Sequence, residues 1–407
     1  MQKLRLSLIL VIGISFYCYE FFLRILTGVY QEQIVQYFNI STHIGFSFLV
    51  SSYNITYLLM QIPAGILLDR FGSKKILILA TITCGVGNVI FISGGYELAL
   101  LGRLLVGIGS SFAFIGVLKL TLENLNPRYF SIITSIVISL GTLAAAFSQN
   151  ISVIISSYDT SWINIFIYSG LIAFPLAILF FLALPKEKYT ISLMPKFDQI
   201  FEVSKKLIKN KSLWQNATWG GLLYIPTVVL TSQYGILYFK QSYGFDNIYS
   251  TTLITSIFIG WIIFSPIKSL LCNKFNGKNI INISILGVGI ICILINLGIF
   301  KNSAILITLF FGMFSASQVL VWYYFNKICP KGFAAIGAAL TNMIITLVIE
   351  VGQLAVGSSI DLGNIINIKA NNCITTMFIV ALFLAFIVLQ RMLRNINNKQ
   401  ISKATKL

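Results

Sequence analysis

Charged residues are scarce in this sequence, and acidic residues are scarcer still. Only 10% of the 407 residues are charged, whereas a soluble domain carries about a quarter. There are 12 acidic residues against 29 basic ones, and 57% of the chain is hydrophobic. A surface with so few charges is not suited to water, so we expect lipid to cover most of it.

Several chemical motifs are also missing. The only histidine is His43, and no G-x-x-x-x-G-K-[ST] phosphate loop occurs. The absence of that loop argues against an ATP-driven pump. A lone histidine argues against an intramembrane enzyme built on a His/Asp dyad or a metal cluster. The six cysteines show no metal or disulfide spacing, so no catalytic residue, metal or cofactor is expected.

Long apolar segments follow one another along the chain, separated by short polar breaks. Each is close to the roughly 20 residues that a membrane-spanning helix needs. The sequence therefore predicts an all-α membrane protein with twelve transmembrane helices. The expected spans are residues 5–27, 44–68, 76–93, 98–120, 132–155, 163–184, 213–239, 251–271, 280–300, 304–325, 334–356 and 373–389.

The distribution of basic residues explains the net charge of +17. With a cytoplasmic N-terminus, 22 of the 29 Lys and Arg residues fall in inner loops and tails and 3 in outer loops. This is the positive-inside pattern of membrane proteins. It predicts two cytoplasmic termini, and it makes a nucleic-acid partner unnecessary.

The longest polar stretch divides the spans into six and six. We expect an N-terminal six-helix bundle at 1–184, a basic cytoplasmic linker at 185–212, a C-terminal bundle at 213–390 and a cytoplasmic tail at 391–407. Within the linker, residues 197–208 have the pattern of an amphipathic helix at a membrane surface, and a solvated linker is the alternative.

A repeated loop supports this division. Residues 69–74, DRFGSK, follow the second span, and residues 273–278, NKFNGK, follow the eighth, 204 residues later. Asn276 stands in the place of Gly72, and we expect it to supply the same left-handed turn, which Asn tolerates better than most residues. The repeat indicates duplication of a six-helix unit.

Two motifs closely resemble those of the major facilitator superfamily. Residues 65–75, GILLDRFGSKK, are similar to the family's loop between helices two and three, and Arg103 followed by the small residues of LLVGIG resembles its helix-four motif. The resemblance implies two six-helix bundles that work by alternating access. It also implies a gating latch in which Asp69 pairs with a neighbouring helix end and Arg70 with Glu123, supported by Gly65, Gly72 and Lys74.

Three N-terminal segments resemble a narrower group, the phagosomal nutrient transporters of intracellular bacteria. They are YEFFLR at 19–24, MQIP at 60–63 and GVLK at 116–119. The resemblance implies amino-acid uptake across a bacterial inner membrane. Helix five lacks the Gly-x-x-x-Gly-Pro run of proton-coupled exporters, which favours import over export.

Ionisable residues inside the predicted spans mark a functional site, because they are costly in a bilayer. Glu20, Arg24, Arg103 and Glu350 all fall in the outer half of the membrane. Glu20 and Arg24 are four residues apart and are expected to pair, which leaves Arg103 for a substrate carboxylate. Glu350 is expected to meet an amino group or a coupling proton, and Glu20 is the other candidate for the proton.

Two buried lysines lie nearer the inner face. Lys119 is a candidate for the substrate site, although it precedes Glu123 by four residues and has a partner there. Lys268 is expected to snorkel or pair. Further polar and aromatic residues are candidates for the cavity lining, although each has helix packing as the alternative: Tyr17, Asn54, Tyr57, Gln149, Asn150, Gln318 and Trp322.

These features predict a monomeric secondary transporter with a zwitterionic or anionic small-molecule substrate, with protons as the coupling ion. Efflux of a small metabolite such as a siderophore is the alternative direction. Tyr224 and Pro226 predict a kink in helix seven, because proline removes a backbone hydrogen bond. Such breaks border binding sites in transporters.

Overall fold

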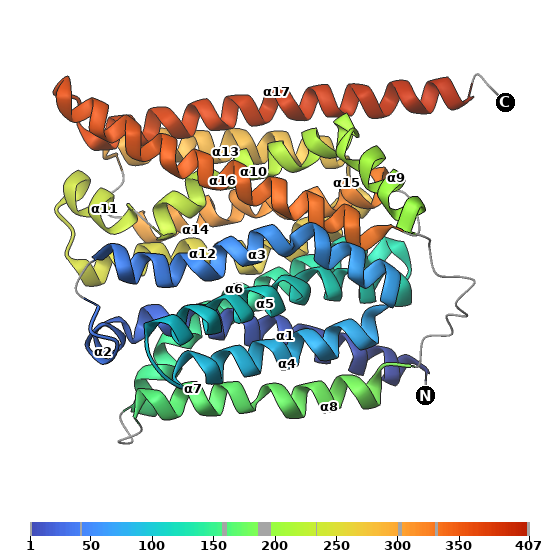
Figure 1. Cartoon of the computed structure of the whole chain (residues 1–407). Coiled ribbons are helices and arrows are strands. Elements are labelled where there is room, and N and C mark those ends of the chain that lie inside the picture. The colour runs from blue at the N-terminus through green and yellow to red at the C-terminus, as the bar shows by residue number, and fades with distance from the viewer. Residues whose placement is uncertain are drawn as a thin grey trace. The chain divides into compact units, whose positions relative to one another are not determined.

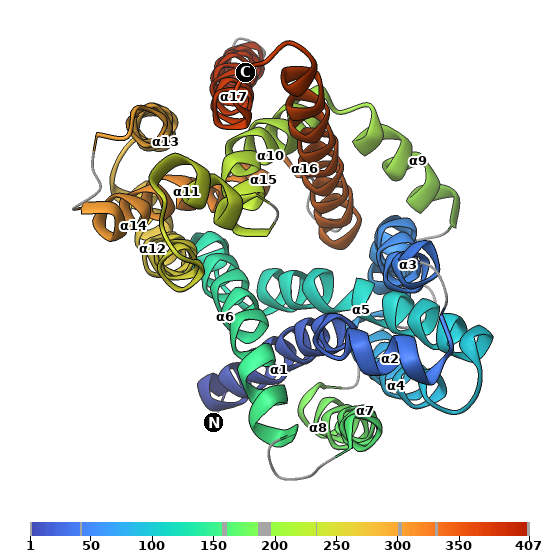
Figure 2. The same cartoon turned by 90° about the vertical axis from the view of Figure 1, so that its left-hand side faces the viewer.

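A computed structural model describes residues 2–40, 43–156, 161–185, 197–232, 234–299, 303–329 and 333–404 (Figures 1 and 2). Every regular element in these ranges is a helix. The chain divides into two compact units, each with its own core. The predicted boundaries of the two bundles and the linker stay a prediction.

Unit 1 comprises Met1–Pro127, Leu140–Lys206 and Pro330–Leu340. It holds the first turns of α16 in addition to helices from the N-terminal part of the chain. Its helices are α1 (Gln2–Val29), α2 (Gln31–Tyr37), α3 (His43–Phe71), α4 (Ser73–Phe91), α5 (Tyr96–Asn124), most of α6 (Phe130–Ser156), α7 (Trp162–Leu171), α8 (Ala173–Ala183) and most of α9 (Phe197–Ile208). Figure 2 shows α4 beside both α5 and α8, which it contacts.

Unit 2 comprises Arg128–Ser139, Leu207–Cys329 and Thr341–Leu407. It includes the first turns of α6, just as unit 1 includes those of α16. Its other helices are α10 (Lys211–Ser232), α11 (Gly235–Tyr243), α12 (Asn247–Lys274), α13 (Gly277–Leu297), α14 (Ala304–Ser315), the 3-10 turn η4 (Ala316–Val319), α15 (Leu320–Ile328), α16 (Ala334–Ile365) and α17 (Ala370–Ala404). Within it, α12 packs on α14, and α17 packs on α10 and α13.

Ten segments of the described chain are long and apolar enough to cross a membrane, so the protein is a multi-pass membrane protein. Each of the twelve predicted spans coincides with one helix or with consecutive helices. The spans that fall short of that apolarity are α3 and α10, which carry more polar side chains, such as Asn54 and Gln61 in α3. The count of twelve and the location of the termini stay predictions.

Close approaches between backbones fix α5 against its neighbours. A Cβ at Gly102 would lie 2.6 Å from the backbone nitrogen of Phe91 on α4, and a Cβ at Gly107 would lie 2.5 Å from the carbonyl oxygen of Tyr53 on α3. No side chain fits at such distances, so glycine lets these helix backbones touch. The contact with α3 places Arg103, one turn before Gly107, at the level of Tyr53.

One prediction about local geometry is corrected. Gly72, the N-cap of α4, has φ 83° and ψ 166°, a region that is essentially restricted to glycine. Asn276, its counterpart before α13, has φ −67° and accepts a hydrogen bond from the Lys278 backbone nitrogen at 3.0 Å. The predicted left-handed turn at Asn276 is therefore wrong, because its side chain caps the helix instead.

Helix α10 continues through Pro226 and ends at Ser232, and the kink expected at Pro226 stays a prediction. The sequence did not indicate a break in the tenth span, where α14 passes into the 3-10 turn η4 before α15 begins.

Candidate functional site

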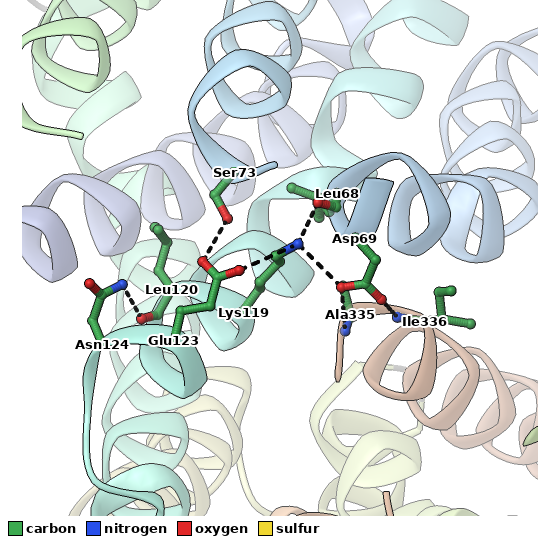
Figure 3. Close-up of polar contacts among 9 residues, drawn as sticks. All are labelled: Leu68, Asp69, Ser73, Lys119, Leu120, Glu123, Asn124, Ala335 and Ile336. Atoms are coloured by element: carbon green, nitrogen blue, oxygen red, sulfur yellow. Dashed lines mark hydrogen bonds and ion pairs between the residues drawn. The ribbon is translucent and has the colours of Figure 1, made fainter. Parts of the chain in front are cut away.

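The Asp69 carboxylate, at the end of α3, binds the first turn of α16. Oδ2 accepts a hydrogen bond from the Ile336 backbone nitrogen at 3.0 Å, and Oδ1 accepts one from Ala335 at 3.4 Å (Figure 3). The first backbone N–H groups of a helix lack intrahelical partners and carry partial positive charge. An acidic side chain therefore satisfies two donors there, and the predicted pairing of Asp69 with a neighbouring helix end is present.

Lys119 on α5 completes this network. Its ammonium lies 3.2 Å from Asp69 Oδ1 and 3.5 Å from Glu123 Oε1, and it donates to the carbonyl oxygen of Leu68. Glu123 also accepts a hydrogen bond from the Ser73 hydroxyl at 3.3 Å. Lys119 is buried and Asp69 is 6% exposed, so the two charges compensate each other away from solvent.

Other loop residues hold the surrounding helices. A Cβ at Gly65 would lie 2.8 Å from Ile336 Cα and 2.9 Å from the Ala335 carbonyl oxygen, so only glycine lets α3 approach α16 this closely. Lys74 donates to the Leu184 carbonyl at 2.7 Å, where α8 ends and presents unpaired carbonyls. The Arg70 guanidinium lies over the Phe71 ring, and its pairing with Glu123 stays a prediction.

A second cluster lies inside unit 1 around Tyr53. The Tyr53 side chain is fully buried, and its hydroxyl donates to Glu20 Oε1. Two guanidinium groups lie near the face of its ring. The Cζ atom of Arg103 is 4.8 Å from the ring centroid, and that of Arg24 is 5.8 Å away. One aromatic ring thus joins the acid and both arginines that the sequence singled out.

Arg103 is the most deeply buried cation of this cluster. It is 2% exposed, and one of its terminal nitrogens donates weakly to the Leu23 carbonyl at 3.4 Å. Its Nε atom has no hydrogen-bond partner among the described residues. A buried guanidinium with an unused donor keeps the capacity to donate a hydrogen bond to a carboxylate.

Glu20 and Arg24 do not form the expected ion pair within the described part of the chain. The Glu20 carboxylate is buried and is held by the Tyr53 hydroxyl. Arg24 has an exposed side chain, and its guanidinium lies over the rings of Phe21 and Tyr53. Attraction to aromatic faces therefore orients Arg24, although the spacing on α1 allowed a direct pair.

An aromatic wall adjoins the cluster. Tyr17 is buried and packs against Phe21 and Phe114, with centroid distances of 5.0 and 5.3 Å. Tyr57 stacks on Tyr53 at 6.0 Å. Aromatic rings therefore flank the cluster on α1, α3 and α5.

The sequence profile of the Major Facilitator Superfamily matches residues 10–353. The chain belongs to this superfamily. It is therefore a transporter rather than an enzyme. No curated protein sequence matches the chain significantly.

Solved structures of transporters share the superfamily fold. A transporter named FucP, in its outward conformation, aligns with a TM-score of 0.70 and 14% identity, over 94% of this chain and 99% of its own. The human organic anion transporter MFSD10 (TETRAN) aligns with a TM-score of 0.70 and 14% identity, over 95% and 99%. A variant of the E. coli fucose:proton symporter FucP gives 0.64 and 14%, over 93% and 99%.

Other candidate residues lie outside the Tyr53 cluster. Asn54 is exposed on α3. In unit 2, Gln318 is buried in η4, and Trp322 is buried just after it in α15. Glu350 is exposed in the middle of α16. The side chains of Gln149 and Asn150 lie outside the described residues. The roles of all these residues stay predictions.

One feature of the site was not predicted. Tyr53 was not among the candidates, although its spacing of four from Tyr57 placed both on one face of α3. Lys119 pairs with Glu123, as its spacing on α5 predicted, and also with Asp69; its role at the substrate site stays a prediction. No group of three or more potential metal ligands occurs among the described residues.

Proposed function

We propose that the protein is a proton-coupled secondary transporter that takes up an amino acid or short peptide across a bacterial inner membrane. The Tyr53 cluster carries this proposal. Two arginines and one glutamate meet there, so the cluster has an excess positive charge when Glu20 is ionised. A substrate carboxylate compensates that charge and uses the free Nε donor of Arg103.

Glu20 is the proposed proton carrier. It is 1% exposed, and it accepts a hydrogen bond from the hydroxyl of Tyr53, whose ring contacts both arginines. It has no ion pair of its own in the described chain. A change in its protonation alters the field at the substrate carboxylate, so proton and substrate binding are linked. Glu350 is the alternative carrier, because it places a carboxylate in the middle of α16, whereas Asp361 lies near the end of that helix.

The Asp69 contact is the proposed gating latch. It satisfies two N–H groups of α16 in one state of the transporter, and those groups must find water or another acceptor when the contact opens. Alternating access in transporters requires such reversible contacts. Resemblance to the phagosomal nutrient transporters, in the segments around Glu20 and Lys119, supports uptake rather than efflux.

The test uses purified protein in proteoliposomes with a panel of labelled amino acids and short peptides. We expect one substrate class to accumulate when the outside is acidic, and to exchange without a gradient. Arg103→Gln should lower uptake by about 10- to 100-fold, since a charge-assisted hydrogen bond contributes about 1.5–3 kcal/mol. Arg391→Gln, in the predicted tail, is the matched control.

Proton coupling has its own readout. Glu20→Gln should abolish gradient-driven accumulation and keep exchange partly intact, whereas accumulation lost only in Glu350→Gln assigns the proton to α16. Unchanged accumulation in both variants contradicts proton coupling. Accumulation in inverted rather than right-side-out vesicles contradicts uptake, and a panel without any substrate contradicts the proposed substrate class.

A further inference from the structure

Lys268 on α12 is a buried lysine that neither the latch nor the Tyr53 cluster uses. The sequence predicted that it would either snorkel toward an interface or form a pair, and it is 7% exposed. Its ammonium donates to the Ser284 hydroxyl at 2.7 Å, the Ser317 hydroxyl at 2.8 Å and the Phe314 carbonyl at 3.0 Å. The snorkelling prediction is therefore wrong, because the side chain turns into unit 2.

The three acceptor oxygens come from three elements that meet at the break in the tenth span. Ser284 lies on α13, Phe314 lies in the last turn of α14, and Ser317 lies in η4. The two hydroxyl groups also contact each other at 2.6 Å. A helix C-terminus carries partial negative charge, and transporters bind cations with the carbonyls of interrupted helices.

All three ammonium protons of Lys268 are used, and none of them reaches a carboxylate. Among the described residues, no Asp or Glu lies within ion-pair distance of this group. Lys119, the other buried lysine, has two carboxylate partners. Burying a cation among neutral oxygens alone costs free energy. The surrounding oxygens must therefore be arranged so that they stabilise the Lys268 ammonium. The Phe314 ring, 5.5 Å from Nζ, adds a cation–π contact.

We propose that Ser284, Ser317 and the Phe314 carbonyl form a monovalent-cation site, and that the chain fills this site with its own Lys268 ammonium. The resident cation joins α12, α13 and the end of α14, and so holds the tenth span in its broken form. Small primary alkylammonium ions and Na⁺ have the chemistry to replace it. Large quaternary ammonium ions do not, because they lack N–H donors and are too bulky.

The test removes the side chain and offers free cations to the purified full-length protein. In Lys268→Ala, methylammonium or Na⁺ at a few hundred millimolar should raise the thermal midpoint by about 2–4 °C over choline chloride at equal ionic strength. Wild type and Lys268→Met should show no such difference, because their side chains fill the space. A midpoint of Lys268→Ala that is equal in all three salts overturns the proposal.

A second measurement decides the matter if Lys268→Ala does not fold. In Ser317→Ala the ammonium loses one acceptor, so this variant should melt several degrees below wild type. In the Lys268→Met background the same change should cost much less, because no cation remains to be satisfied. Equal effects of Ser317→Ala in both backgrounds show that the two residues act independently, and they overturn the proposal. Ser315→Ala, at the same break, controls for the loss of a buried hydroxyl contact, because Ser315 bonds to Thr227 and not to the ammonium.

Discussion

The two copies of the repeated loop follow equivalent helices, but they differ in the charge and burial of their first residue. In the first, Asp69 is buried and binds two backbone N–H groups of α16. In the second, the equivalent residue is Asn273, and it is exposed. The first loop is therefore a charged contact to a helix end, and the second is not.

The neighbouring positions follow the same division. One turn before Asp69, Gly65 lets two backbones meet. One turn before Asn273, Ser269 forms a hydroxyl contact of 3.2 Å with Ser131 in the first turns of α6. Lys119 and Glu123 correspond to Tyr323 and Lys327, whose phenol and ammonium lie 2.7 Å apart. The buried pair of opposite charges, Asp69 and Lys119, thus lies in the first copy.

Two helices, α6 and α16, are divided between the two units. Helix α16 begins in unit 1 and continues in unit 2, and α6 begins in unit 2 and continues in unit 1. Asp69, in the first loop, contacts the first turn of α16, and Ser269, one turn before the second loop, contacts the first turn of α6. Contacts of different strength at equivalent places predict that the Asp69 contact controls the transport cycle and that the Ser269 contact mainly packs.

Removing the Asp69 carboxylate should produce the largest effect. Asp69→Ala leaves Lys119 buried with Glu123 as its remaining carboxylate, and it frees two N–H groups of α16. Loss of one partner of a buried pair costs about 3–5 kcal/mol. We expect a fall of about 3 kcal/mol in the free energy of unfolding, measured by equilibrium denaturation in detergent, together with loss of transport in proteoliposomes.

The matched change in the second loop is Asn273→Ala. Because that side chain is exposed, its loss should change the free energy of unfolding by no more than about 0.5 kcal/mol and should leave transport intact. If the two variants behave alike, the asymmetry between the loops has no energetic basis. The double variant Asp69→Ala/Lys119→Met should regain part of the lost stability, since it removes the uncompensated cation.

The next effect in size concerns the contacts one turn earlier. Gly65→Ala places a methyl group 2.8 Å from Ile336 Cα, and overpacking of this kind costs about 1–3 kcal/mol. Ser269→Ala removes only a hydroxyl contact and should cost about 1 kcal/mol. Thermal unfolding of both variants in the same detergent ranks them, and a lower midpoint for Ser269→Ala contradicts the ranking.

Much of this fold could be predicted from the sequence, because apolar runs and basic loops report on the bilayer directly. The contact of Asp69 with a helix end was predicted through a family motif, since Asp69 and Ile336 are 267 positions apart and no local pattern joins them. The place of Tyr53 was not predicted, because an aromatic residue in an apolar helix resembles any other until the helices pack. The η4 break contains no proline or glycine to announce it.

The helix starts after the two loops provide the smallest and most local test. Gly72 has φ 83° and ψ 166°, whereas Asn276 has φ −67°. Gly72→Asn copies the second loop into the first and forces a side chain into a glycine-only region, so it should cost about 1–2 kcal/mol. Asn276→Gly copies the first loop into the second and loses only a cap, which costs a few tenths of a kcal/mol. Thermal midpoints of the two variants measure this difference, and equal midpoints would show that the two turns tolerate the same residues after all.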